Sequence, residues 1–301
     1  MKKTSVVPII YAVAAAVFYA LSTPFSKRLL GHVGPTFMAA LLYLGAGIGM
    51  GALYLALGRK SGGGRLTRAD APYAAGMILL DIAAPILLML GLKTATSASA
   101  ALLNNFEIAA TSVIALFVFK EAVSPRLWLG IGLITVSSVL LSVEDGGSLG
   151  FSGGALLILL AAVCWGFENN CTRRISNKNT YEIVILKGIF SGLGSLVIAV
   201  FAGESAPGLK YALMALLLGF AAYGLSIFFY IRAQRDLGAA KTSAYYAVAP
   251  FVGALLSYLL IKEPLSRHYV PALLIMIAGS AAVVTDTLGV GPGRGIEEEE
   301  K

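Results

Sequence analysis

Long apolar runs separated by short polar segments dominate the chain from residue 7 to residue 287. A transmembrane helix needs about 20 mostly apolar residues, and ten segments reach that length. They lie near residues 7–28, 35–58, 72–92, 96–119, 126–143, 152–175, 181–202, 210–232, 240–261 and 269–287. The pattern therefore predicts an all-α integral membrane protein with ten transmembrane helices.

The composition agrees with a surface that faces lipid. Hydrophobic residues make up 57% of the 301 residues, and charged residues only 13%. Soluble domains carry about 25% charged residues, so this chain has too little charge to cover a water-facing surface. Its formal net charge of +7 comes from basic residues between the apolar segments, a pattern that indicates membrane topology and no nucleic-acid partner.

The distribution of lysine and arginine predicts the orientation. Of the 23 lysines and arginines, 16 would lie on the side of the N-terminus, six on the opposite side, and Lys187 within a span. Cytoplasmic loops carry the basic excess, so both termini are expected in the cytoplasm. Residues 289–301 would then be a cytoplasmic tail. The short loops favour a multi-pass protein of a bacterial plasma (inner) membrane.

The chain also repeats itself. The segment 15–20 (AAVFYA) corresponds to 161–166 (AAVCWG), and Lys120-Glu121 corresponds to Lys262-Glu263. The repeat predicts two five-helix units, residues 1–146 and 147–288. Because five is odd, the second unit would enter the membrane from the opposite side. Such inverted repeats are typical of secondary transporters, which bind their solute near the membrane midplane between the two units.

These features together resemble a known family. The two five-helix units, the aromatic-then-small pairs Tyr19-Ala20 and Trp165-Gly166, and the Lys-Glu pairs resemble the EamA-type branch of the drug/metabolite transporter superfamily. The resemblance covers essentially the whole chain. It implies export of amino acids, aromatic ones among them, or of other metabolites, through a central cavity lined by helices 1, 3, 4, 6, 8 and 9.

Little in the sequence points to an enzyme. A phosphate-binding loop with Gly-Lys-Ser/Thr is absent, so transport is expected to be secondary or facilitated. Only two histidines and two cysteines occur, and they form no recognisable metal site or catalytic triad. We expect no cofactor and no metal. A monomer is expected, because two units of one chain can enclose a cavity.

Four ionisable residues fall inside predicted spans, where charge is costly and usually functional. They are Asp81, Glu107, Glu168 and Lys187. Glu168 and Lys187 lie at matching depths in consecutive helices, which predicts an ion pair between them. One interpretation is that this pair only locks the two helices together. The other is that Glu168 joins Asp81 and Glu107 in a site for substrate binding or coupling.

Polar and aromatic residues near these charges complete the predicted site. Helical spacing brings Asn104 near Glu107, and Asn169 flanks Glu168. The further candidates are aromatic: Trp165, Tyr223, Tyr245 and Tyr246. Interfacial anchoring or core packing is the alternative for each tyrosine. Prolines within spans can bend a helix, and the candidates for gating or kinks are Pro24, Pro85 and Pro250.

The sequence therefore predicts a secondary exporter of small metabolites that works by alternating access, with amino acids as the favoured solutes. The solute's ammonium would meet Asp81 or Glu107. A desolvated carboxylate also takes up a proton more readily than one in water, so exchange for protons is expected. One alternative is export of cationic drugs, polyamines or guanidinium compounds. Another, of a different class, is a non-transporting membrane scaffold or receptor.

Overall fold

The computed structural model describes residues 6–57, 64–95, 100, 103–104, 106–142, 153–262, 265 and 267–288, and the described secondary structure is helical throughout apart from one isolated backbone bridge. The first half contains α1 (Val7–Ala20), α2 (Ser22–Leu29), α3 (Pro35–Ala56), the short η1 (Arg68–Asp70), α4 (Ala71–Thr94), α6 (Phe106–Phe117) and α7 (Pro125–Ser142). The second contains α8 (Gly153–Ile175), α9 (Thr180–Phe201), α10 (Leu209–Leu218), η2 (Gly219–Leu225), α11 (Ser226–Leu237), α12 (Ala239–Tyr246), α13 (Ala249–Ile261) and α14 (Tyr269–Leu288).

Eight segments of the described chain are long and apolar enough to cross a membrane. They are Val7–Leu29, Pro35–Ala56, Arg68–Thr94, Gly153–Ile175, Thr180–Phe201, Leu209–Leu237, Ala239–Ile261 and Tyr269–Asp286. Helices α6 and α7 occupy the other two predicted spans, parts of which lie outside the described residues. The total of ten spans and the position of the termini stay predictions. The proposed tail 289–301 and Glu263 also lie outside the described residues.

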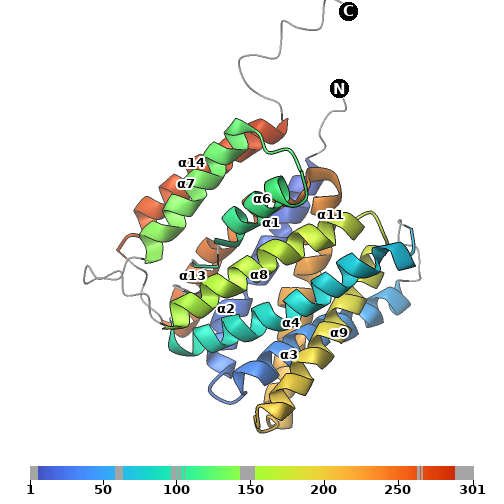
Figure 1. Cartoon of the computed structure of the whole chain (residues 1–301). Helices are drawn as coiled ribbons and strands as arrows, with labels where there is room; N and C mark the ends of the chain where they lie inside the picture. Colours follow the sequence, from blue (N-terminus) through green and yellow to red (C-terminus); the bar gives the residue numbers. More distant parts are fainter. Residues whose placement is uncertain are drawn as a thin grey trace, which may run out of the picture.

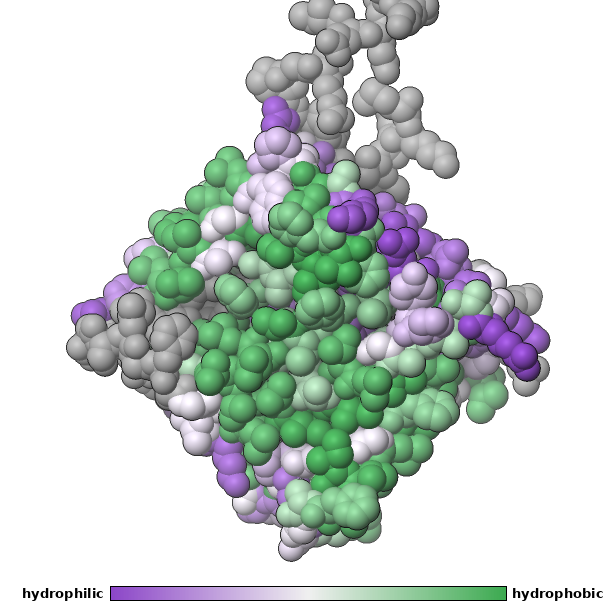
Figure 2. Space-filling model, viewed as in Figure 1, coloured by the Kyte–Doolittle hydropathy of each residue, from purple (hydrophilic) through white to green (hydrophobic). Residues whose placement is uncertain are grey.

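The surface is the one that a lipid environment favours. Many large apolar side chains are exposed, among them Leu79, Phe201, Leu217 and Leu274. Figure 2 shows hydrophobic residues across the middle of one face and hydrophilic residues gathered toward its edges. In Figure 1, α1 begins and α14 ends on the same side of the bundle, as an even number of crossings requires.

Equivalent helices of the two halves make equivalent contacts across the boundary between the halves. The second span of each half packs on its counterpart (α3 on α9), and so does the fifth (α7 on α14). The third span of each half packs on the first span of the other half, as α4 on α8 and α11 on α1. Both Lys120 and Lys262, which follow the fourth span of each half, have the same left-handed φ of 59°. The halves therefore interlock as two similar units.

Glycines allow the α3–α9 contact. A methyl group added to Gly47 would lie 2.7 Å from the backbone nitrogen of Ile189, and one added to Gly188 would meet the backbone of Gly47. Small residues let transmembrane helices approach closely. This contact sets α9, which carries Lys187, directly against α3.

A pair of matched substitutions in α3 tests this packing. Gly47→Ala should destabilise the protein by about 1–3 kcal/mol, the usual cost of overpacking, whereas Gly51→Ala has no atom within 4 Å of the added methyl group and should change little. The measurement is thermal unfolding of the two purified variants in detergent. Equal melting temperatures would show that α3 and α9 do not depend on this close approach.

Candidate functional site

Among the predicted spans whose residues the structure describes throughout, three are interrupted, and two of the interruptions lie near predicted prolines. Helix α1 gives way to α2 at Leu21, three residues before Pro24, and α12 gives way to α13 just before Pro250. Helix α4 runs through Pro85 without interruption. In the eighth span, η2 is a π-helical stretch between α10 and α11. Such stretches often occur at functional sites, and this one carries Tyr223.

A cavity lies between helices of the two halves. It measures about 50 Å³, room for a few water molecules. The lining comes from the first, second, fourth, sixth, seventh, eighth and ninth predicted spans: Tyr19, Tyr43, Glu107, Trp165, Glu168, Asn169, Thr172, Lys187, Tyr223, Ser226, Ile227, Tyr230, Ile231 and Tyr246. A metabolite larger than a few waters therefore requires the helices or side chains to move apart.

Aromatic rings form much of the cavity wall. Tyr19 is the centre of this group, with ring centroids 6.4 Å from Trp165, 5.7 Å from Tyr223 and 5.5 Å from Tyr246. The Trp165 and Tyr223 contacts are edge-to-face, an arrangement that aromatic pairs favour. The rings come from α1, α8, η2 and α12, so the wall joins both halves of the chain.

A buried ion cluster occupies one side of the cavity. The Lys187 ammonium lies 2.8 Å from a carboxylate oxygen of Glu168 and 3.1 Å from one of Asp81. The Tyr43 hydroxyl donates to the other Asp81 oxygen at 2.6 Å, and the Thr172 hydroxyl donates to Glu168. Lys187 thus joins α9 to both α4 and α8. The sequence predicted its pairing with Glu168 but not its contact with Asp81.

Glu107 has a different environment. Its carboxylate accepts a hydrogen bond of 2.6 Å from the side-chain amide of Asn169, which also donates to the Thr111 hydroxyl at 3.2 Å. Glu107 is only 8% exposed, and no ion pair among the described residues includes it. It is a buried carboxylate whose partner is a neutral amide.

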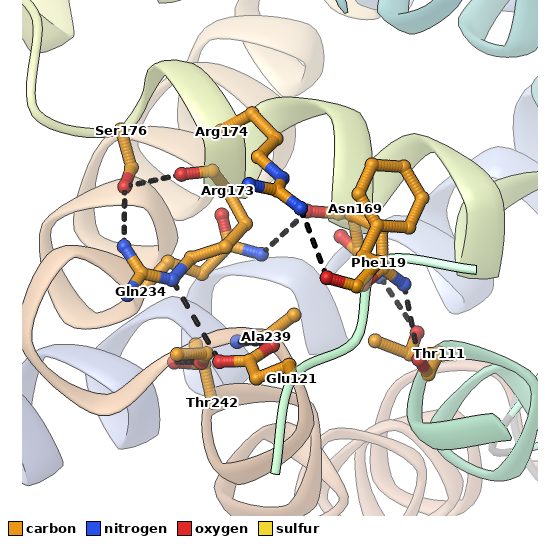
Figure 3. Close-up of polar contacts among 12 residues, drawn as sticks. Thr111, Phe119, Glu121, Asn169, Arg173, Arg174, Ser176, Gln234, Ala239 and Thr242 are labelled. Atoms are coloured by element: carbon orange, nitrogen blue, oxygen red, sulfur yellow. Dashed lines mark hydrogen bonds and ion pairs between the residues drawn. The ribbon is translucent and has the colours of Figure 1, made fainter. Parts of the chain in front are cut away.

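Further contacts near the end of α8 hold Asn169 and α6 in place (Figure 3). Gln234 donates to the backbone oxygen of Asn169 at 3.1 Å, and Asn170 donates to that of Thr111 at 3.0 Å. Arg174 reaches the backbone oxygen of Phe119 at 2.9 Å. These bonds tie α8 to α11 and to the end of α6, and so fix the amide that faces Glu107.

The Glu121 carboxylate extends this network to a fourth helix, α12. It accepts a hydrogen bond from the backbone nitrogen of Ala239 at 3.3 Å and lies 3.9 Å from Arg173. Lys120, just before it, adopts a left-handed conformation that ends α6 and turns the chain. Glu121 thereby links the end of α8 to the start of α12.

Six of the nine predicted binding residues line the cavity: Glu107, Trp165, Glu168, Asn169, Tyr223 and Tyr246. The other three do not. Asp81 lies behind Lys187, because α4 contributes none of the lining residues. Asn104 donates weakly, at 3.4 Å, to the Tyr19 hydroxyl. Tyr245 packs in a separate apolar cluster, since consecutive helical residues point in different directions.

Sequence reasoning missed Tyr43 and the position of Lys187 in the cavity wall. Tyr43 lies within an apolar run between two leucines, so no local pattern marks it. The resemblance implied lining by the third span, whereas the second and seventh spans contribute instead. The depth of Lys187 was readable from its helix, but the direction of its side chain depends on the α3–α9 packing.

Two interlocking helical halves with a polar cavity between them are the arrangement of many membrane transporters. The sequence pattern of the EamA-like transporter family matches residues 6–143 and again residues 152–285. The chain therefore belongs to the EamA-like transporter family, as its resemblance predicted.

Similar proteins agree with this assignment. A protein of Methanothermobacter thermautotrophicus described as an uncharacterized transporter is 25% identical over 89% of this chain and 83% of its own length. The uncharacterized transporter YyaM of Bacillus subtilis is 24% identical over 64% of this chain and 66% of its own. A crystal structure with 19% identity shares the fold, with a TM-score of 0.75 over 92% of this chain and 98% of that one.

The ion cluster yields a stability prediction. Lys187→Met should cost about 3–5 kcal/mol, because it leaves buried carboxylates without their cation. The triple variant Lys187→Met, Asp81→Asn, Glu168→Gln removes all three charges and should recover most of the loss. Thermal unfolding in detergent measures both. If the triple variant melts as low as the single one, unpaired charge is not the source of the instability.

Proposed function

We propose that the protein is a secondary transporter that exports small metabolites by alternating access, with amino acids, aromatic ones among them, as the favoured solutes. The observation that supports this most is Glu107, a buried carboxylate that faces an aromatic-lined cavity and has an amide, not a cation, as its partner. The proposal includes no cofactor and no catalytic activity.

The position of Glu107 favours exchange of a solute for a proton. A lone carboxylate at membrane depth is costly while it is charged. A proton or the ammonium group of a solute can neutralise it, but both cannot occupy it at once. A solute that leaves Glu107 on one side of the membrane would then be replaced by a proton, and the proton gradient would drive export.

The aromatic wall supports a solute with an apolar part. Tyrosine and tryptophan rings offer large apolar faces, attract cations through their π-electrons and carry polar groups that orient a ligand. An aromatic or aliphatic side chain would rest against Trp165 and Tyr223 while its ammonium meets Glu107. The Asn169 amide offers a donor to a solute carboxylate.

The arrangement of the two halves supports alternating access. The cavity lies between them, and the halves meet through equivalent helix pairs. In inverted-repeat transporters, rocking of the halves around a fixed site exposes that site to each side in turn. We further propose that both termini lie in the cytoplasm, which the lysine and arginine asymmetry supports. We also propose that the protein is a monomer in a bacterial inner membrane.

A second candidate solute class is favoured by the charge balance. The described residues in and beside the cavity include three buried carboxylates, Asp81, Glu107 and Glu168, but only one lysine, Lys187, which pairs with Asp81 and Glu168. This acidic excess also suits a cationic drug, polyamine or guanidinium compound. Inhibition of flux by small organic cations and not by amino acids would favour this class.

The test is flux of labelled phenylalanine from proteoliposomes with and without an imposed pH gradient. Glu107→Gln should slow the flux about ten- to hundredfold and remove its dependence on the gradient, since a charge-assisted hydrogen bond contributes about 1.5–3 kcal/mol. The matched control is Glu182→Gln, the same change in the first turn of α9 outside the cavity lining, and it should transport normally.

Unchanged, gradient-dependent flux in Glu107→Gln would remove Glu107 from the mechanism. If no amino acid shows flux, the proposed solutes become cationic drugs, polyamines or guanidinium compounds. Absence of flux for those as well would favour the non-transporting scaffold or receptor.

A further inference from the structure

The two carboxylates that contact Lys187 differ in their access to the cavity. Glu168 and Lys187 both line it, whereas Asp81 does not and is fully buried. Asp81 therefore holds the ammonium from behind, and Glu168 covers it from the cavity side. A solute in the cavity can replace Glu168 as a partner of Lys187 but cannot reach Asp81.

Lys187 is also the only cationic residue in the described lining of this cavity. The titratable groups around the pair come from several helices: Tyr43 of α3, Asp81 of α4, Glu107 of α6, Cys171 of α8, Tyr223 of η2 and Tyr230 of α11. None of these adds a positive charge. Lys187 is thus the strong electrostatic partner that the described lining offers to a carboxylate entering the cavity. In this structure Lys187 is already paired with Glu168.

We propose that Lys187 recognises the carboxylate of the transported solute, and that Glu168 occupies Lys187 in the empty protein and takes up a proton when the solute displaces it. This inference rests on the proposed function and names the group that selects for a carboxylate. Lys187 is then the residue that distinguishes amino acids from the corresponding amines.

The charge balance requires the proton. In the empty protein one ammonium faces two carboxylates, and the cluster carries one negative charge. If a solute carboxylate joined it while Glu168 stayed ionised, a buried carboxylate would lack a cation, which is strongly unfavourable. A proton from water that binds a Glu168 carboxylate oxygen gives a neutral carboxylic acid. The cluster then keeps a single negative charge, and no bond within the solute changes.

The surrounding hydroxyl groups suit this exchange. The Thr172 hydroxyl donates to ionised Glu168, and a hydroxyl can equally accept a hydrogen bond from a protonated carboxyl group. The Tyr43 hydroxyl donates to one Asp81 oxygen at 2.6 Å while the other Asp81 oxygen contacts Lys187, so Tyr43 orients that carboxylate toward Lys187. Asp81 is therefore a positioning residue that holds the ammonium charged while its other partner changes.

The experiment compares phenylalanine with phenethylamine, which lacks only the carboxylate. Each is added to the purified full-length protein in weakly buffered detergent solution near neutral pH, and a pH indicator reports protons taken up per bound ligand. We expect phenylalanine to bind with about one more proton taken up than phenethylamine. In Glu168→Gln this difference should vanish. In Glu107→Gln it should remain, because Glu107 meets the ammonium that both ligands share.

A second variant measures the recognition itself. Lys187→Met should weaken phenylalanine binding about tenfold or more and should not weaken phenethylamine binding, since only phenylalanine has a carboxylate that pairs with the Lys187 ammonium. The Glu168→Gln comparison keeps the test decisive if Lys187→Met fails to fold.

Two results would overturn the inference while leaving the transporter proposal intact. In the first, both ligands bind the wild-type protein with equal proton uptake. In the second, the difference persists in Glu168→Gln. Binding of phenethylamine alone would overturn carboxylate recognition and favour cationic solutes. If neither ligand binds, the proposal of amino acid transport fails and this inference fails with it.

Discussion

The ammonium of Lys187 lies between the carboxylates of Asp81 and Glu168, and this buried cluster joins α4, α8 and α9. Charge inside a membrane is stable only when it is paired and hydrogen-bonded. The pairing therefore fixes how these three helices face one another. Because α9 lies against α3 and α4 lies against α8, the cluster also sets the position of the helices that carry Tyr43 and Asn169.

The scaffold is repeated, but its chemistry is not. Equivalent helices of the two halves pack in equivalent ways, and the chain turns through the same left-handed conformation at Lys120 and Lys262. None of the three carboxylates has a carboxylate at the equivalent position of the other half, since Asp81 corresponds to Tyr223, Glu107 to Ala249 and Glu168 to Ser22. Such a frame is typical of transporters that open to opposite sides in turn, and in the proposed mechanism the asymmetric charges mark where the solute binds.

The sequence predicted the fold more fully than the site. Apolar runs of membrane length and the internal repeat were sufficient for the helical architecture and the family, because lipid allows few alternatives to helices. Helix rise also gave the matching depths of Glu168 and Lys187. Rotation about each helix axis was not readable from the sequence. Helical periodicity alone does not tell which of Tyr245 and Tyr246 faces the cavity, and only the latter lines it.

The same limit explains why the sequence did not show that Asp81 lies outside the cavity lining or that Tyr43 lies within it. The position of Asp81 along the third predicted span places it near the membrane midplane. That position could not show that α4 lies behind Lys187. Tyr43 is surrounded in sequence by apolar residues, so only the packing of α3 on α9 reveals its bond to Asp81. Interruptions within spans, such as the π-helical stretch at Tyr223, depend on tertiary contacts in the same way.

Alternating access requires the cavity to open first to one side of the membrane and then to the other. Ser226 lines the cavity, and Ser226→Cys in a background of Cys164→Ala and Cys171→Ala places one thiol there. In proteoliposomes we expect membrane-impermeant thiol reagents to label it from either side, with each reaction slowed by phenylalanine. Labelling from one side only, under every pH gradient and with or without solute, would contradict alternating access through this cavity.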